Sequence, residues 1–120
     1  MTNKPSIEIE YTADFKRDLK QLHKKHRNIR ADVDDFARRL EAGETPGDQV
    51  QGTGYTVYKA RLRSRDLKRG KSGGYRVLYY IRTARRIVLL TIYVKTERED
   101  ISMAEIRRIV KEHEQPPEHE

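Results

Sequence analysis

Hydrophobic and polar residues alternate near the N-terminus and again in the second half of the chain, which is typical of β-strands. At the N-terminus, Ile7, Ile9 and Tyr11 fall on one side of the predicted strand 6–11, and two glutamates fall on the other. Stretches rich in β-branched and aromatic residues predict three further strands, over residues 55–63, 75–82 and 86–95. The connection at 83–85 is short, so we expect these strands to be antiparallel neighbours.

The last of these strands carries the strongest apolar pattern. Val88, Leu90, Ile92 and Val94 alternate along it and predict one wholly apolar face. The opposite face becomes more polar toward its end. This pattern favours a central position in the sheet.

Apolar spacings of three and four residues predict helices in the remaining segments. Thr12 is placed to cap a first helix, and Asn28 begins a second that ends at Gly43. Ser102 and Glu105 have the spacing of a capping box and open a third helix. The apolar stripes of the three helices are Phe15, Leu19 and Leu22; Ile29, Val33, Phe36, Ala37 and Leu40; and Ile106, Ile109 and Val110.

These elements predict an α+β fold. It consists of an N-terminal strand, a helical hairpin that covers a sheet, a three-stranded antiparallel meander and a C-terminal helix. No internal repeat or composition shift divides the chain, so we expect one domain over residues 1–114. The last residues, 115–120, contain two prolines and are expected to form a flexible tail.

Charge is distributed unevenly along the chain. The sequence of 120 residues has a formal net charge of +7, and residues 59–76 alone carry eight bases and one acid, a balance of +7. Neighbouring cations add their potentials over a Debye length of about 8 Å at physiological salt. The concentration therefore predicts a surface for a polyanion, with nucleic acid as the leading candidate. The eight bases are Lys59, Arg61, Arg63, Arg65, Lys68, Arg69, Lys71 and Arg76.

Composition argues against several other classes of protein. The chain has no cysteine, and its four histidines lack the spacing of a metal site, so we expect neither thiol chemistry nor a metal or other cofactor. No apolar run approaches the roughly 18 residues of a membrane span, and the N-terminus lacks the apolar stretch of a secretory signal. These features predict a cytoplasmic protein that does not bind a membrane.

Three sequence blocks, in this order, resemble the RelE/ParE toxin superfamily, and most closely its RelE/HigB branch. They are YKARLR at 58–63, RGKSGGYRVLYY at 69–80, and LLTIYVKTE at 89–97 followed by DIS at 100–102. The resemblance implies the toxin of a bacterial toxin–antitoxin pair, which enters the ribosome and cuts messenger RNA without a metal. It also implies a cognate antitoxin, encoded by a neighbouring gene and joined to a DNA-binding domain.

The resemblance places the positively charged catalytic residues of the family on Lys59 and Arg61, and its arginine of the next strand on Arg76. Lys95 matches a basic residue at the end of the last strand. The next arginine of the family falls on Thr96, with Arg98 as a nearby substitute. Ser102 stands where some members have a tyrosine, and Tyr93 is the nearest replacement.

Strand periodicity supports a shared cationic face. Lys59, Arg61 and Arg63 recur at every second residue, about 6.6 Å apart, which suits contact with a phosphate backbone. RNA cleavage by its own 2′-hydroxyl needs a base, an acid and cations around the phosphorane. We expect Lys59 as the base or its electrostatic partner, Arg61 and Arg76 as phosphate ligands, and Lys95 or Tyr93 as the acid.

The remaining cations are predicted to bind RNA without taking part in the reaction. They are Arg63, Arg65, Lys68, Arg69, Lys71 and Arg98. Two other functions remain open at this point: a ParE-like toxin that inhibits DNA gyrase and cuts nothing, and an RNA-binding domain without catalysis.

Overall fold

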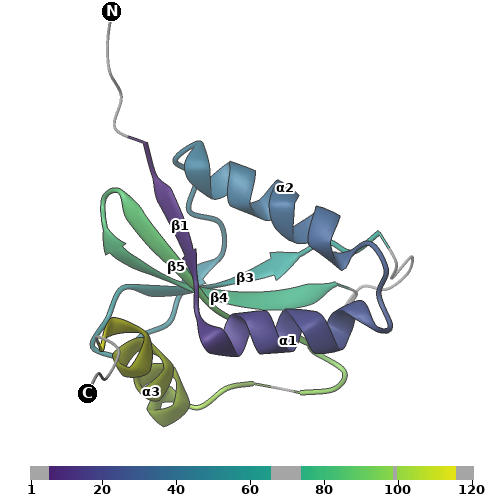
Figure 1. The fold of residues 1–120 in the computed structure, drawn as a ribbon. Helices are drawn as coiled ribbons and strands as arrows, with labels where there is room; N and C mark the ends of the chain where they lie inside the picture. The colour runs from purple at the N-terminus through teal and green to yellow at the C-terminus, as the bar shows by residue number, and fades with distance from the viewer. Residues whose placement is uncertain (1–5, 66–73, 99, 116–120) are drawn as a thin grey trace, which may run out of the picture.

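Helices cover both faces of a five-stranded sheet in the computed structural model, which describes residues 6–65, 74–98 and 100–115 (Figure 1). The elements are β1 (Glu8–Tyr11), α1 (Ala13–His23), α2 (Ile29–Glu41), β2 (Asp48–Gln49), β3 (Val57–Leu62), β4 (Tyr75–Thr83), β5 (Arg86–Val94) and α3 (Met103–Glu114). The predicted α+β class and the predicted order of elements are confirmed. Of the predicted tail, only Gln115 lies within the described residues.

The strands lie in the order β1-β5-β4-β3-β2. The predicted antiparallel meander is confirmed, because β4 pairs with β3 on one side and with β5 on the other. The N-terminal strand β1 runs parallel to β5 and covers only its first half, where Glu8 pairs with Arg86 and Tyr11 with Leu89. The two-residue strand β2, which was not predicted, pairs with β3 at Lys59 and Tyr58.

The helical hairpin begins and ends as its sequence predicts. The Thr12 hydroxyl accepts the Phe15 N–H at 2.9 Å, and it donates to the Leu90 carbonyl at 2.7 Å. The cap therefore fixes the start of α1 against β5. At the other end of the hairpin, Gly43 has a φ of 94°, which terminates α2 in a conformation that glycine adopts at little cost.

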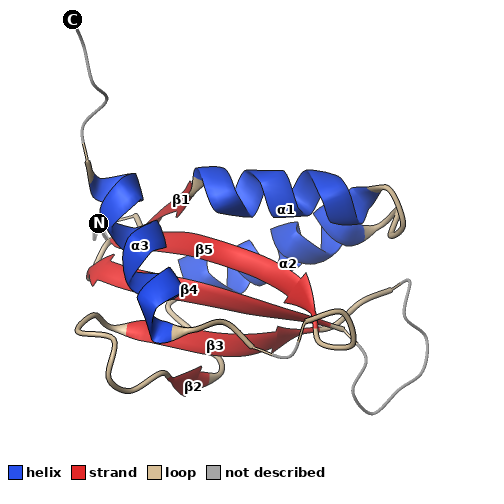
Figure 2. Ribbon diagram, turned by 90° about the horizontal axis from the view of Figure 1, so that it is seen from below, coloured by secondary structure: helices blue, strands red, loops and turns tan. Residues whose placement is uncertain are grey.

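Two hydrophobic clusters hold the layers together, one on each face of the sheet. Figure 2 shows the layers themselves, with α3 on one face of the sheet and the helical hairpin on the other. On one face, Phe15 of α1 and Ile29, Phe36 and Leu40 of α2 are fully or almost fully buried against the strands. On the other face, Ile106, Ile109 and Val110 of α3 pack against Val57, Leu78, Val88 and Leu90. Burial of apolar area on both faces is the main stabilising contribution.

The single apolar face predicted for the last strand is wrong. The pairing of β4 with β5 shifts between Leu78 and Tyr79, which face Thr91 and Leu89, so Leu90 is an extra residue in the ladder. A β-bulge of this kind reverses the phase of the side chains that follow. Val88 and Leu90 pack beneath α3, whereas Ile92 and Val94 pack beneath the helical hairpin.

Candidate functional site

A row of three polar side chains crosses the middle of the sheet. Arg61 of β3 pairs in register with Arg76 of β4, and Arg76 pairs with Tyr93 of β5. Residues directly opposite in a ladder project to the same face. Lys59 lies two residues before Arg61 on β3 and shares that face. The structure thus brings together four of the five predicted catalytic residues.

Helix α3 divides this face into two regions. Val57, Leu78 and Val88 lie in the apolar cluster beneath α3. Farther along the same strands lies the row Arg61–Arg76–Tyr93, of which Tyr93 still belongs to this apolar cluster. The face is therefore apolar where α3 packs and cationic where the row crosses it.

Two buried polar atoms of the row have no hydrogen bond of ordinary geometry among the described residues, although one of them, the Tyr93 hydroxyl, interacts with the Asp100 carboxylate. They are Nη1 of Arg76 and the hydroxyl oxygen of Tyr93, which belong to side chains that are 8% and 6% exposed. Buried polar groups are nearly always paired in native proteins, since an unpaired group costs about 1–3 kcal/mol. The unpaired Nη1 of Arg76 indicates a place for an acceptor ligand, and the positive charge of Arg76 favours an anion.

The environment of Tyr93 keeps its hydroxyl protonated. Burial raises the pKa of Tyr93, and the negative charge of Asp100 raises it further. At neutral pH, Tyr93 therefore has a proton to donate and cannot serve as a base.

Lys59 meets a carboxylate that sequence reasoning did not assign to the site. The Lys59 Nζ lies 3.3 Å from Oδ1 of Asp100, and the same oxygen accepts the Ile101 N–H at 2.8 Å. This backbone hydrogen bond is the main reason that the pKa of Asp100 is lowered. The order of sequence blocks put Asp100 near the site, but no spacing signal singled it out.

A hollow of about 400 Å³ adjoins the cationic residues at the edge of β3. Lys59, Arg61 and Arg76 line it together with Arg39 of α2 and Asp48 of β2. The backbone here is tightly packed, because a Cβ added to Gly47 would stand 2.2 Å from the Lys59 carbonyl oxygen. Arg39 and Asp48 were not predicted as site residues, since they lie far from residues 59–76 in the sequence.

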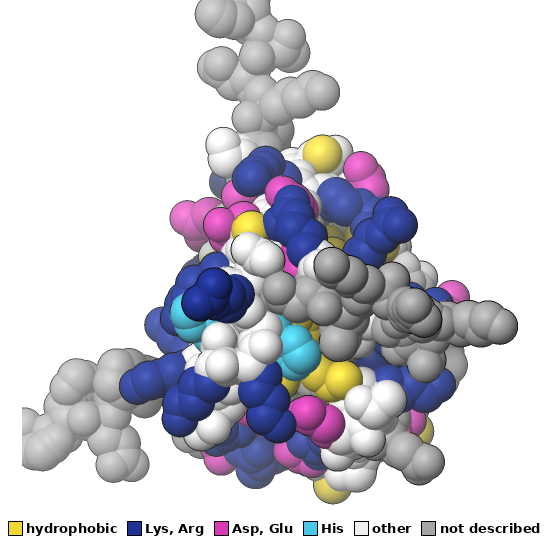
Figure 3. Space-filling view, turned by 90° about the vertical axis from the view of Figure 1, so that its right-hand side faces the viewer, with side chains coloured by type: hydrophobic (Ala, Val, Ile, Leu, Met, Phe, Trp, Pro, Cys, Tyr) yellow, Lys and Arg dark blue, Asp and Glu magenta, His cyan; other side chains and the backbone are white. Residues whose placement is uncertain are grey.

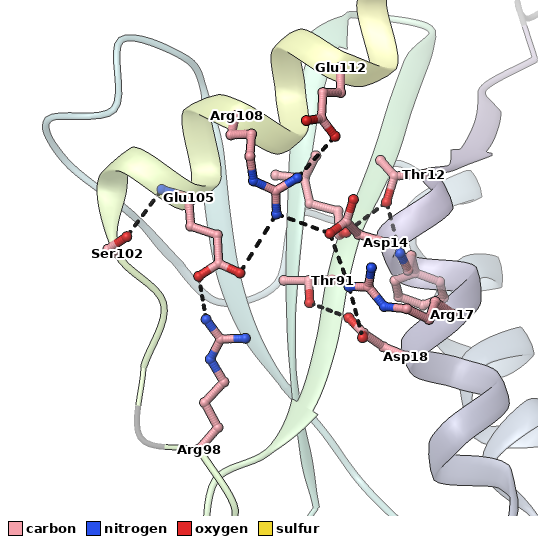
Figure 4. A network of polar contacts seen from close by, with 12 residues as sticks. Thr12, Asp14, Arg17, Asp18, Thr91, Arg98, Ser102, Glu105, Arg108 and Glu112 are labelled. Atoms are coloured by element: carbon pink, nitrogen blue, oxygen red, sulfur yellow. Dashed lines mark hydrogen bonds and ion pairs between the residues drawn. The ribbon is translucent and has the colours of Figure 1, made fainter.

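Arg98 connects the site to α3. Its Cζ lies 5.9 Å from the centre of the Tyr93 ring, and its Nε donates to the Asp100 carbonyl at 3.1 Å. It also forms an ion pair with Glu105 of α3. Figure 4 shows these contacts continuing through Arg108 to Asp14 of α1, which fixes the segment after β5 between two helices.

The other predicted site residues lie apart from the row. Lys95 is exposed in the turn after β5, and Arg63 is exposed just beyond β3. Arg65 contacts α2, where its guanidinium lies 3.1 Å from Asp32 and 2.5 Å from Asp35. Lys68, Arg69 and Lys71 lie outside the described residues.

Cations are not confined to the predicted segment. Figure 3 shows Lys and Arg side chains gathered with His on the side of the molecule where α1 and α2 are joined. The exposed cations here include Lys20 in the last turn of α1 and Lys24, Lys25 and Arg27 in the connection. Lys25 lies 3.7 Å from Glu97 in the turn after β5.

Within the described ranges, no three His, Asp or Glu side chains are grouped so that they hold a metal ion. In the same ranges, no helix has the length and apolar character needed to cross a membrane.

Comparisons with known proteins identify the family of the chain. The family described as the RelE toxin of the RelE / RelB toxin–antitoxin system matches residues 13–115. A solved structure of a double arginine-to-alanine mutant of the E. coli toxin RelE in the free state matches with a TM-score of 0.51 and 15% sequence identity. That match covers 90% of this chain and 94% of the E. coli chain, and it shows a RelE-like fold. The chain belongs to the RelE toxin family.

Proposed function

We propose that this toxin is an endoribonuclease that cuts messenger RNA on the ribosome and so inhibits translation. Membership of the RelE family makes the chain a toxin of a toxin–antitoxin system with a cognate antitoxin as its partner. The observation that carries the nuclease proposal is the row Arg61–Arg76–Tyr93, in which the buried Nη1 of Arg76 has no partner among the described residues.

In the proposed reaction, the 2′-oxygen of a nucleotide attacks the adjacent phosphorus, and the bond from phosphorus to the 5′-oxygen breaks. The products are a 2′,3′-cyclic phosphate and a 5′-hydroxyl. Arg61 and Arg76 stabilise the extra negative charge of the phosphorane, because guanidinium groups stay charged and bind phosphate oxygens in pairs. Tyr93 donates the proton that the departing 5′-oxygen needs.

Lys59 is assigned to the side of the attacking hydroxyl, as the base or as the electrostatic partner of the 2′-oxygen. Lys95 is the alternative acid. It is exposed in the turn after β5, whereas Tyr93 is buried in the sheet. Arg63, Arg65, Lys68, Arg69, Lys71 and Arg98 are proposed to bind RNA outside the reaction centre.

The test is a cell-free translation reaction with purified ribosomes. The wild-type protein is expected to stop protein synthesis and to cut the message at codon boundaries. The double variant Lys59→Ala, Arg76→Ala should leave the message intact. A matched double variant of exposed cations away from the row, Arg85→Ala with Lys111→Ala, should cut at the wild-type rate.

Two outcomes would replace the proposal. Intact message together with gyrase-dependent DNA breaks would indicate a toxin of the gyrase-inhibiting kind. RNA that is bound with a strong salt dependence but left whole would indicate a binding domain without catalysis. Full-rate cleavage by the double variant Lys59→Ala, Arg76→Ala would show that the reaction requires neither residue.

A further inference from the structure

Asp100 places a negative charge where the cationic residues are arranged for an anion. Its Oδ1 lies 3.3 Å from the Lys59 Nζ, which is ion-pair distance. Lys59 shares its face of the sheet with Arg61 and lines the same hollow as Arg61 and Arg76. A carboxylate oxygen and a phosphate oxygen make the same kind of hydrogen bond to an ammonium group.

We propose that Asp100 is an internal competitor for the phosphate of RNA: it occupies Lys59 in the free toxin, and a bound phosphate displaces it. This inference rests on the proposed RNA activity, and it assigns to Asp100 a role in setting the affinity of the site for RNA.

The pair is poorly suited to a purely structural role. The Lys59 side chain is 37% exposed and the Asp100 side chain 64% exposed. Pairs this open to water contribute little to folding and exchange readily with other ions. Asp100 can therefore release Lys59 without unfolding any part of the chain.

The backbone that carries Asp100 stays in place when the pair breaks. Ile101 is buried in the cluster beneath α3, and the Asp100 carbonyl accepts a hydrogen bond from Arg98, which α3 holds through Glu105. The Ile101 N–H holds Oδ1 of Asp100 at 2.8 Å, so the pair breaks most simply by rotation of the Lys59 side chain toward the phosphate. The carboxylate remains close to the site and pairs with Lys59 again when the RNA leaves.

The Asp100→Asn variant separates charge from structure. An asparagine oxygen still accepts the Ile101 N–H, so the local hydrogen bond is kept while the charge is removed. Asp34→Asn is the matched control, because it removes one exposed carboxylate from α2 and changes the net charge equally.

The measurement is the affinity for a fully 2′-O-methylated RNA oligonucleotide of mixed sequence, which lacks the attacking hydroxyl and stays intact. Asp100→Asn is expected to bind roughly twofold to fivefold more tightly than the wild type, as expected for one exposed ion pair. The gain should shrink as the salt concentration rises, because salt screens the exposed pair between Lys59 and Asp100. Asp34→Asn should give a smaller gain.

A double-mutant cycle assigns the gain to Lys59. In a Lys59→Ala background, Asp100→Asn should give no more than the gain seen with Asp34→Asn. An equal gain with and without Lys59, or Asp100→Asn binding no more tightly than Asp34→Asn, would overturn the competition.

Elution from heparin repeats the comparison with sulfate groups in place of phosphates, so it does not depend on RNA activity. Later elution of Asp100→Asn than of Asp34→Asn supports the competition even if the wild type leaves every message whole. Equal elution of the two variants overturns it, whatever the fate of the RNA proposal.

Discussion

Arg76 and Tyr93 are direct partners across β4 and β5, and Arg76 buries a polar atom, Nη1, that no described residue satisfies. A protein that only needed to fold would gain from apolar side chains at this pair. Polar groups kept in place at a cost to stability are typical of functional sites. The pair is therefore the best place to separate function from folding by mutation.

Tyr93→Phe removes the hydroxyl and keeps the ring. We expect the free energy of unfolding to fall by no more than about 1 kcal/mol, because the only interaction lost among the described residues is the one with the exposed Asp100 carboxylate. Message cleavage on ribosomes should fall roughly 10²- to 10⁴-fold, as expected for loss of a general acid. Single-turnover cleavage and urea unfolding measure the two effects.

Lys95→Ala is the companion variant for this prediction, because Lys95 is the alternative acid. Wild-type cleavage by Tyr93→Phe, combined with a large loss in Lys95→Ala, would transfer the acid role to Lys95.

Arg65 is predicted to stabilise the fold as well as to bind RNA. Its guanidinium pairs with Asp32, and its backbone N–H donates to the same carboxylate at 3.2 Å. The Asp32 side chain is only 3% exposed, so Arg65→Ala leaves a buried charge with fewer partners. We expect a loss of about 1–3 kcal/mol in the free energy of unfolding, measured with urea.

Arg63→Ala is the control, since Arg63 is exposed two residues away. It should cost less than about 0.5 kcal/mol. Equal stability of the two variants would show that the contact with Asp32 contributes nothing to folding, and it would leave Arg65 with its predicted RNA contact alone.

Local sequence patterns were sufficient to predict most of the fold, because most helices and strands follow the hydrophobic periodicity expected for their type. Thr12 and Ser102 cap α1 and α3 as expected, accepting the N–H groups of Phe15 and Glu105. Strand β2 was not predicted, because a strand of two residues is too short to show an alternating pattern. Its position depends on contact with β3 instead.

The bulge at Leu90 shows where periodicity fails. Strict alternation places Tyr93 on the same side as Leu89, toward the helical hairpin. One extra residue in the β4–β5 ladder moves Tyr93 to the face of Arg76. Helices cover both faces of β5, so apolar residues are buried whichever face they point to. Hydrophobicity along the strand therefore does not show on which face a given residue lies.

Charge counting found the cations of the site but not their partners. Lys59, Arg61 and Arg76 stand out because they lie within one basic segment. Asp100 and Arg39 come from distant segments, and only the folded chain brings them to Lys59 and to the hollow.

Glu10 gives the fold a dependence on acid pH. Its carboxylate lies 2.9 Å from Nε2 of His113 on α3 and 2.6 Å from Arg86. The hydrogen bond with His113 is the main reason that the pKa of Glu10 is lowered from 4.5. A carboxylate with a lowered pKa in the folded state adds stability above its unfolded pKa and loses it as the pH falls through the folded value.

We therefore expect Glu10→Gln to be less stable than the wild type at pH 7, by about 0.5–1.5 kcal/mol. The difference should shrink as the pH falls below 4.5, where the wild-type carboxylate also becomes neutral. Urea unfolding at a series of pH values measures it. A difference that stays constant down to the acid limit would mean that the charge of Glu10 is not the source of the effect.

Asp14 joins the helices on opposite faces of the sheet. Its Oδ2 accepts from Arg17 of the same helix at 3.1 Å and from Arg108 of α3 at 3.2 Å, and its side chain is only 10% exposed (Figure 4). Because Asp14 lies in the first turn of α1, it also meets the positive end of the helix dipole. Asp14→Ala removes all three interactions and should cost about 1–2 kcal/mol in the free energy of unfolding.

Glu112→Ala provides the comparison, since it removes an exposed carboxylate that pairs with the same Arg108 at 2.9 Å. We expect a loss of less than about 0.5 kcal/mol for this pair, which lies at the surface within one helix. Equal losses in the two variants would place the contribution of Arg108 within α3. A clearly larger loss in Asp14→Ala, measured by urea unfolding, would show that Asp14 is the contact that attaches α3 to α1.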